Sequence, residues 1–300
     1  MYPRLAGMAV AGLWRVAGCE TMTGVKTVDM KLAGPLWLIG GGNMAGAMLS
    51  RWLATGLDPA CVTVIRPSGK PVAEGVRVLT TVPDDPPPAM VMLGMKPHQL
   101  DQVAPTLAPA LGEDTILLSI LAGAEIASLR TRFPAPRNIV RVMPNTPARV
   151  GKGATILFAP DGAPEMLAAV ERLMTPLGLV EWVDDERLFD IVTTLTGSGP
   201  AFVFRFIAAL ADGAVALGMD PARAQRLALV TVEGATVLAG ASGESPDALA
   251  ERVASPGGTT RAGLAVLDAD DRLRRLIQDT FAAAVRREQE MRAAARGEGG

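Results

Sequence analysis

A glycine-rich stretch near the start of the chain has the residue types and the spacing needed to hold a phosphate group. In IGGGNMAGA (residues 39–47), Gly40, Gly42 and Ala45 have the spacing G-x-G-x-x-A, directly after an apolar run and at the start of a helical pattern. Gly40 permits a tight turn, Gly42 lets the backbone approach a pyrophosphate, and Ala45 allows close helix packing. Unpaired N–H groups at the helix start favour the anion. We therefore predict dinucleotide binding; the alternative is merely a tight strand-to-helix turn.

The end of the next apolar run indicates which dinucleotide to expect. An acidic residue about 20 positions after the glycines would bind an unphosphorylated ribose. The chain instead has VIRPSGK (residues 64–70), where Arg66, Ser68 and Lys70 offer a guanidinium, a hydroxyl and an ammonium to a ribose phosphate. NADPH is therefore predicted, with NADH as the second candidate. The alternative is that these residues form an ordinary solvated turn.

Three later strand ends are expected at the same sheet edge, where ligands collect in a parallel sheet. Lys96 and Pro97 follow one strand and are predicted to border the nicotinamide ribose, and Ala122 is small enough to let a flat ring approach. His98 is the single histidine of the chain, but it follows a proline at a predicted helix start, so we assign it no proton transfer. The amide of Asn145 is expected either at this edge or in a simple turn bond.

The stretch SPGGTT (residues 255–260) combines structure-breaking residues with two threonines that lead into a helical pattern. A helix start presents several unpaired backbone N–H groups with partial positive charge, which suits a carboxylate. Gly257 and Gly258 would let these donors curl around the anion, and Thr259 and Thr260 would add hydroxyl groups. We predict a carboxylate-binding loop here.

A second small-residue stretch, TGSGP (residues 196–200), is also interpreted as a loop that opens a helix. Ser198 and Pro200 would then stand at the helix start, where they could contribute to an anion site. The alternative is that Ser198 and Pro200 are only helix caps, and for this stretch alone the capping interpretation is favoured.

The surrounding pattern predicts a sheet followed by helices. Beginning at Pro35, apolar, β-branched runs end at glycine or proline and alternate with helical segments, which indicates an α/β domain with a mostly parallel sheet. The later runs lie at residues 61–68, 75–79, 89–97, 115–123, 138–147, 153–160 and 178–183, the last two being expected as edge strands. After about Asp184 the pattern is helical throughout. A helix in residues 202–217 is apolar nearly all round, which suggests burial against another subunit.

Composition narrows the function classes. Of 300 residues, 49% are hydrophobic and 20% are charged, and the formal net charge is −2, which argues against a nucleic-acid partner. Two distant cysteines and one histidine argue against a disulfide framework and a zinc site, so no metal and a reducing, cytoplasmic location are expected. No uninterrupted apolar run of about 18 residues occurs, so no membrane helix is expected.

The first 33 residues are interpreted as an extension before the first domain, expected to be disordered. An apolar stretch ending in VAGC is similar to a lipoprotein cleavage site, but Arg15 places a charge where a signal peptide should be apolar. Export is therefore not the preferred interpretation. A true start at Met22 or Met30 remains an alternative.

Taken together, the motifs IGGGNM, MKP, RVMPNTP, TGSGPAFVF and SPGGTT occur in an order that resembles the pyrroline-5-carboxylate reductase family, from about Leu36 to Arg287. The resemblance implies an NADPH-binding Rossmann-type domain at residues 34–184 and an all-α dimerisation and substrate domain at residues 185–300. It further implies a homodimer with intertwined helical domains, which can assemble into larger rings. The implied reaction is hydride transfer to pyrroline-5-carboxylate, a cyclic imine, giving L-proline in the last step of proline biosynthesis.

The resemblance also assigns residues to roles. Its cofactor positions fall on Gly40, Gly41, Gly42, Asn43, Met44, Lys96, Pro97 and Ala122, to which Arg66 and Ser68 are added from this chain's own sequence. The substrate positions fall on Glu186, Gly257, Gly258, Thr259 and Thr260, to which Ser198 is added from the TGSGP stretch. The Thr260 hydroxyl is expected near the ring nitrogen and is the predicted catalytic group. Glu186 matches an acidic substrate position of some members; the alternative is a solvated charge.

Two other functions fit the sequence less well. A β-hydroxyacid dehydrogenase has a similar two-domain plan but commonly uses a lysine of its helical domain as acid/base, and the last lysine of this chain is Lys152. A catalytically idle NADPH-binding or regulatory protein has no support from the intact glycine loops. A protonated cyclic imine accepts hydride once it is held against the nicotinamide, so positioning supplies most of the catalysis and no further acid is required.

Overall fold

The computed structural model describes residues 30–295, and the side chains of residues 30–290. The predicted extension of residues 1–33 therefore lies almost wholly outside the described residues, as does the proposed start at Met22. The described chain forms two compact units: residues 30–200 with 281–295, called here the sheet unit, and residues 201–280, called the helical unit. The predicted domain boundary between residues 184 and 185 marks the change from strands to helices, whereas packing groups residues 185–200 with the sheet.

The sheet unit contains an eight-stranded sheet in the order β3-β2-β1-β4-β5-β6-β7-β8. The strands are β1 (Leu36–Ile39), β2 (Val62–Ile65), β3 (Arg77–Leu79), β4 (Met90–Leu93), β5 (Ile116–Ser119), β6 (Asn138–Met143), β7 (Gly153–Phe158) and β8 (Gly178–Trp182). All neighbours pair in parallel except β6 and β7, which are antiparallel. The predicted mostly parallel α/β sheet is confirmed, although β7 lies inside the sheet and only β8 is an edge strand on that side.

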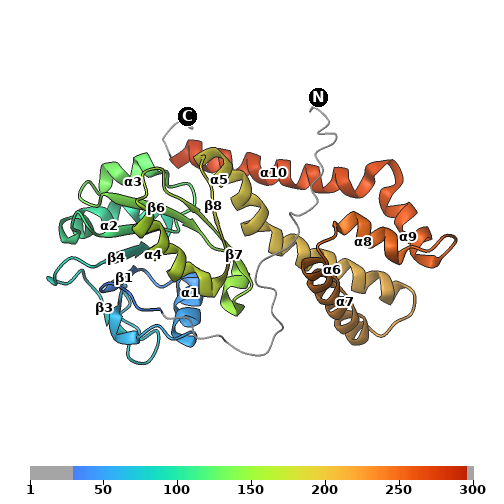
Figure 1. Ribbon diagram of the computed structural model, residues 1–300, viewed down its shortest axis with the longest axis horizontal. Helices are drawn as coiled ribbons and strands as arrows, with labels where there is room; N and C mark the ends of the chain where they lie inside the picture. The colour runs from blue at the N-terminus through green and yellow to red at the C-terminus, as the bar shows by residue number, and fades with distance from the viewer. Residues whose placement is uncertain (1–29, 296–300) are drawn as a thin grey trace. The chain divides into compact units, whose positions relative to one another are not determined.

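Helices cover both faces of this sheet, which explains why central strands such as β1 and β4 are apolar at every position. On β1, Leu36 and Leu38 point into a core with α1 (Asn43–Ala54) and α4 (Pro164–Met174). Trp37 and Ile39 point into the opposite core with α2 (Leu100–Leu107) and α3 (Ile126–Arg132). Figure 1 shows α2 and α3 together on one side of the strands. The carboxyl ends of the parallel strands are thereby fixed at one edge.

The helical unit contains most of α6 (Gly199–Ala216), α7 (Pro221–Ser242), α8 (Pro246–Val253), α9 (Thr259–Asp268) and the start of α10 (Arg272–Ala295). Side-chain oxygens of Asp220 and Ser245 cap α7 and α8, because each accepts a backbone N–H of its first turn. The buried cluster of this unit consists of three alanines, Ala211, Ala224 and Ala228. Its large apolar side chains instead lie on the surface, among them Val203, Phe204, Phe206, Leu210, Leu217, Leu227, Leu229, Val230, Val237 and Leu238.

The predicted loop at residues 196–200 is wrong. α5 (Glu186–Thr193), a π-helical segment (Thr194–Ser198) and α6 follow one another without a break. Polar and small residues interrupt the apolar pattern here, but the helix continues through them as a π-helical turn. By length and composition alone, the continuous helix Glu186–Ala216 would suffice to cross a membrane, although its apolar run is interrupted by charged residues. The predicted absence of a membrane contact is therefore untested.

Candidate functional site

A cleft of about 1040 Å³ opens at the carboxyl ends of β1, β2, β4 and β5. All ten residues predicted to bind the cofactor line it: Gly40, Gly41, Gly42, Asn43, Met44, Arg66, Ser68, Lys96, Pro97 and Ala122. A volume of this size is at the upper end of the range for ligand sites. The sheet therefore brings together residues that are more than 80 positions apart in the sequence, at the edge where ligands bind in this kind of sheet.

The glycine loop has the backbone geometry that the motif predicts. Gly40 has φ +95°, and a Cβ there would lie 2.9 Å from the backbone nitrogen of Met95, so only glycine fits. Gly42 precedes the first residue of α1 without a side-chain cap, and the first turn carries no acidic residue. Ala45 is buried and packs closely against Gly94: a Cβ added to Gly94 would lie 2.9 Å from the Cβ of Ala45. The loop thus leaves the start of α1 open to an anion.

Arg66 stands beside this loop, at the end of β2. Its Nη1 atom lies 3.2 Å from the position that a Cβ of Gly41 would take, so the guanidinium lies against the loop backbone. Ser68 follows in the next turn, where its hydroxyl accepts the Lys70 N–H at 3.4 Å. None of the described residues that line the cleft is acidic, whereas Arg66 and Lys96 both line it. Lys70 is not among the lining residues, so its side chain is not assigned to the cleft.

Sequence reasoning missed several polar residues of the cleft: Thr80, Thr81, Gln99, Gln102 and Thr106. Gln99 fixes the turn at Lys96, because its side-chain oxygen accepts the Lys96 N–H at 2.9 Å. Thr80 and Thr81 directly follow β3, the parallel neighbour of β2. Their position after a strand was therefore the signal that could have identified them. His98 is exposed and is not among the lining residues.

Glu186, a predicted substrate residue, is engaged with protein groups. Its carboxylate accepts a hydrogen bond from the Arg141 guanidinium at 2.9 Å and another from the backbone N–H of Ile126 at 3.0 Å. The second bond caps the start of α3. Arg141 is 2% exposed, lies 3.4 Å from Asp190, and has its guanidinium carbon 4.2 Å from the ring centre of Phe189. The alternative of a solvated charge is wrong for Glu186. Its contact with a substrate stays a prediction.

Asn145, which follows β6, does not form a simple turn bond. Its amide nitrogen donates to the carbonyl of Thr196 at 2.9 Å, and its amide oxygen accepts the Ala154 N–H at 2.9 Å. The first of these bonds spans 51 residues and reaches the π-helical segment. Ser198, the predicted substrate residue in that segment, is half-buried. The interpretation of Ser198 as a residue at a helix start is wrong, because the helix is continuous there; its contact with a substrate stays a prediction.

The SPGGTT stretch does form a loop that opens a helix, in the helical unit. Gly257 has φ +72°, Gly258 precedes the helix, and α9 begins at Thr259. The Gly258 N–H donates to the Ser255 carbonyl at 3.0 Å, so this donor belongs to the loop itself. Both Thr259 and Thr260 are exposed. Donors for a carboxylate are therefore expected at the start of α9 rather than at Gly258.

Arg261 stabilises this loop from within the helical unit. It pairs with both carboxylate oxygens of Glu251 in α8, at 2.7 and 3.1 Å, and donates to the Ala254 carbonyl at 3.0 Å. Hydrogen bonding to Arg261, and then its positive charge, lower the pKa of Glu251. The ends of α8 and α9 on either side of the loop are thus fastened together.

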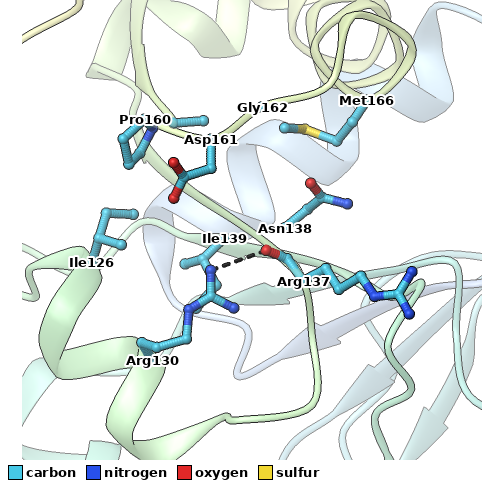
Figure 2. A pocket seen from close by; sticks show the side chains of 10 residues that line it. Ile126, Arg130, Arg137, Asn138, Ile139, Pro160, Asp161, Gly162 and Met166 are labelled. Carbon is cyan, nitrogen blue, oxygen red and sulfur yellow. Dashed lines mark hydrogen bonds between the residues drawn. The ribbon is translucent and has the colours of Figure 1, made fainter.

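A second cavity, shown in Figure 2, measures only about 10 Å³. It lies between α3, the start of β6 and the segment that follows β7, and it is lined by Ile126 and Met166 among others. Arg130 at its wall donates to the carbonyl of Arg137 at 3.0 Å. The space holds at most about one water molecule. It is therefore too small for a dinucleotide or for a cyclic imine.

The fold and the large cleft define the class of an NAD(P)-dependent oxidoreductase. A family model described as NADP oxidoreductase coenzyme F420-dependent matches residues 36–123, and one described as pyrroline-5-carboxylate reductase dimerisation matches residues 186–291. A pyrroline-5-carboxylate reductase of Synechocystis sp. is 39% identical over 264 residues, covering 85% of this chain and 97% of that protein. The chain belongs to the pyrroline-5-carboxylate reductase family.

Solved structures agree with this assignment. A pyrroline-5-carboxylate reductase from Coxiella burnetii has a TM-score of 0.78 and 32% identity, and the match covers 86% of this chain and 98% of that one. The Plasmodium falciparum pyrroline carboxylate reductase, solved with NADP bound, has a TM-score of 0.75 at 24% identity, with 87% and 98% covered. The predicted family, fold class and reductase activity on a carbon–nitrogen double bond are confirmed, and a helical dimerisation region is present.

Proposed function

We propose that this protein reduces pyrroline-5-carboxylate to L-proline with NADPH, as a homodimer. The choice of NADPH rests on the lining of the cleft. Arg66 and Ser68 line it just after β2, and no described lining residue is acidic. A guanidinium can bind a ribose phosphate with two parallel hydrogen bonds, whereas NADH would be favoured by a carboxylate at this position. NADH is the second, weaker cofactor.

In this function the sheet unit holds the cofactor, and the substrate contacts come from the loop before α9 in the helical unit together with Ser198 and Glu186 of the sheet unit. Gly40, Gly41, Gly42, Asn43 and Met44 hold the pyrophosphate, and Lys96, Pro97 and Ala122 border the nicotinamide ribose. Bound NADPH supplies a hydride to the imine carbon, and the imine nitrogen carries the proton. The chain's own contribution is to bind the two molecules in a fixed geometry, which lowers the barrier by removing orientational freedom.

The substrate contacts are assigned to Gly257, Gly258, Thr259 and Thr260, together with Ser198 and Glu186. The free N–H groups at the start of α9 bind the carboxylate, and the Thr260 hydroxyl orients the ring nitrogen. Exposure of Thr259 and Thr260, and the fastening of the loop by Arg261, support this assignment. Since the loop and the cleft lie in different units, their meeting is part of the proposal.

We assign the exposed apolar surface of α6 and α7 to the contact with a second copy of this chain. Phe204 is 64% exposed and Val230 is 63% exposed, which is costly for side chains of this size in an isolated unit. Intertwined helical domains would bury this surface, and dimers would then be able to assemble further. The predicted cytoplasmic location belongs to this proposal, because NADPH-dependent biosynthesis of an amino acid uses intracellular cofactor.

The test is the oxidation of NADPH by the purified full chain in the presence of pyrroline-5-carboxylate, repeated with NADH. Thr260→Ala is expected to lower kcat about 100-fold with little change in the Kd of NADPH, since removing one positioned hydrogen-bonding group typically costs this much. Unchanged turnover would reject the role of Thr260. No turnover of the wild-type protein with either cofactor would reject the function.

The choice of cofactor is tested with a matched pair of variants. Arg66→Ala should weaken NADPH binding at least about tenfold and leave NADH binding nearly unchanged, because the lost hydrogen bonds go to the phosphate alone. Lys70→Ala is the control, since Lys70 does not line the cleft. Equal losses for both cofactors in Arg66→Ala would remove the phosphate contact from the proposal.

A further inference from the structure

The side chain of Asn145 joins two parts of the sheet unit that the sequence keeps far apart. The antiparallel register of β6 and β7 pairs Met143 with Ile156, so position 145 falls opposite position 154 just beyond the last pair. There the Asn145 side-chain oxygen, instead of a backbone carbonyl, accepts the Ala154 N–H. The amide nitrogen remains for another acceptor, which is the carbonyl of Thr196.

The amide of Asn145 fits this place in only one orientation. It is 7% exposed, and one end faces an N–H group while the other faces a carbonyl. Rotation of the amide by 180° would place oxygen against oxygen and N–H against N–H, at the cost of two buried unpaired groups. The side chain therefore acts as a rigid bridge between the end of β6 and the π-helical segment.

This bridge lies beside the cofactor cleft. β5 and β6 are parallel neighbours with Ser119 opposite Arg141, so the residues after each strand emerge side by side. The residues after β5 include Ile120 and Ala122, which line the cleft. Those after β6 lead to Asn145. The bonded carbonyl of Thr196 belongs to a π-helical segment, a form of helix that is rare and often occurs at functional sites.

We propose that Asn145 is a positioning residue for hydride transfer: its amide fixes the π-helical segment Thr194–Ser198 against the cofactor edge of the sheet. The proposal rests on the function assigned above, in which Ser198 contacts the substrate. Ser198 lies two residues after the carbonyl that Asn145 holds, so loss of the bond frees the segment that carries it. A misplacement of about 1 Å at a reacting centre lowers the rate about 100-fold. Asn145 itself does not line the cleft.

The experiment uses Asn145→Asp and Asn145→Ala in the full chain. Aspartate keeps the oxygen that accepts the Ala154 N–H but replaces the donor to Thr196 with a second acceptor, so it breaks only the bond to the π-helical segment. Alanine removes both bonds. Asn138→Asp and Asn138→Ala are the matched controls, because Asn138 begins the same strand at its other end, beside the small cavity of Figure 2.

Four quantities are measured: kcat and KM for pyrroline-5-carboxylate, the Kd of NADPH, and the number of NADPH-binding sites per chain. Expressing kcat per NADPH-binding site removes unfolded molecules from the comparison, so a merely structural role leaves this value unchanged. We expect kcat per site to fall about tenfold or more in both Asn145 variants, with the Kd of NADPH within about twofold of wild type. The Asn138 variants should match wild type.

Two results would overturn the proposal. One is a kcat per NADPH-binding site in Asn145→Asp equal to that of wild type. The other is an Asn145→Asp protein without NADPH-binding sites, because that would make Asn145 a residue required for folding of the sheet unit. Inactivity of the wild-type protein would instead reject the proposed function, so the two failures are distinguishable.

Discussion

The sheet unit and the helical unit bury their apolar residues to very different extents. In the sheet unit, Trp37 and Trp52 are at most 1% exposed, and each belongs to a large apolar cluster on one face of the sheet. In the helical unit the buried cluster consists of alanines, while Leu217 is 92% exposed. Burial of apolar surface contributes roughly 25 cal/mol per Å². The sheet unit can obtain this stabilisation within one chain, and the helical unit cannot.

This difference separates the two tasks of the protein. A cofactor cleft requires a rigid frame, and the two-sided core of the sheet provides one that is complete in a single chain. The helical unit belongs to the part of the sequence that matches a dimerisation family, and its exposed side chains need a partner surface. Stability of the helical unit should therefore depend on protein concentration, whereas stability of the sheet unit should not.

The largest expected effect is the loss of the dimer on placing a charge in the exposed apolar surface. Phe204→Glu should raise the dimer dissociation constant about 1000-fold, since burying an unpaired carboxylate costs about 4 kcal/mol. Analytical ultracentrifugation over a range of concentrations measures this shift. Val150→Glu is the control, because Val150 is equally exposed, at 67%, but lies in the sheet unit. Dissociation in both variants, or in neither, would contradict the contrast between the units.

The second prediction concerns the buried ion pair of the sheet unit. Arg141→Met should lower the free energy of unfolding by about 3 kcal/mol, because it removes the cation that faces Glu186 and Asp190. Urea unfolding, followed by tryptophan fluorescence, measures the loss. The cost is at the lower end of the usual range because the Glu186 side chain is 30% exposed and keeps some water. Adding Glu186→Gln to this variant should recover part of the loss; an equal or greater loss would contradict the pairing.

The third prediction compares two glycines of the cofactor loop. Gly40→Ala should destabilise the sheet unit by about 2 kcal/mol, because φ +95° and a 2.9 Å approach to Met95 both exclude a Cβ. Gly42→Ala should leave stability unchanged, since its φ of −67° suits alanine and its Cβ would meet only Gly94 at 3.7 Å. It should nevertheless weaken NADPH about tenfold, because the Cβ obstructs the pyrophosphate. Thermal unfolding and NADPH titration together distinguish these outcomes.

Local sequence was sufficient for the parts of the site that are built from consecutive residues. The spacing of Gly40, Gly42 and Ala45, and the cations after β2, were read from motifs in which the chemistry and the turn coincide. Their meeting with Lys96 and Ala122 followed from the rule that carboxyl ends of parallel strands share an edge. The meeting of strand ends at one edge depends only on the regular succession of strands and helices, and the apolar pattern of the sequence predicts that succession.

Bonds between distant residues could not be read in the same way. Arg141 lies within an apolar strand, and its partners Glu186 and Asp190 are spaced as successive turns of one helix face, but nothing in the sequence pairs them across 45 residues. The bond from Asn145 to Thr196 was missed for a related reason. Small residues around Thr196 favour turns and so predict a loop, whereas the segment there is π-helical and its Thr196 carbonyl is held by the distant amide of Asn145.

The smallest expected effect tests whether the loop before α9 is held within the helical unit alone. Arg261 lowers the pKa of Glu251, so the unfolded chain binds a proton at higher pH than the folded protein does. The pair therefore stabilises the fold above the ordinary glutamate pKa of 4.5, and this contribution is lost as the pH falls through the lower folded value. The group is fully exposed, so the change in Tm should be small and should decrease further in high salt.

Glu251→Gln isolates this contribution. The difference in Tm between wild type and variant should be present at pH 7, diminish below pH of about 4.5, and disappear once Glu251 is protonated in the folded protein. Glu290→Gln is the control for a charge removed elsewhere, because its partner Arg287 lies three residues away on the same helix and fastens no loop. A Tm difference that persists at low pH would show that Glu251 stabilises the loop through packing and not through its charge.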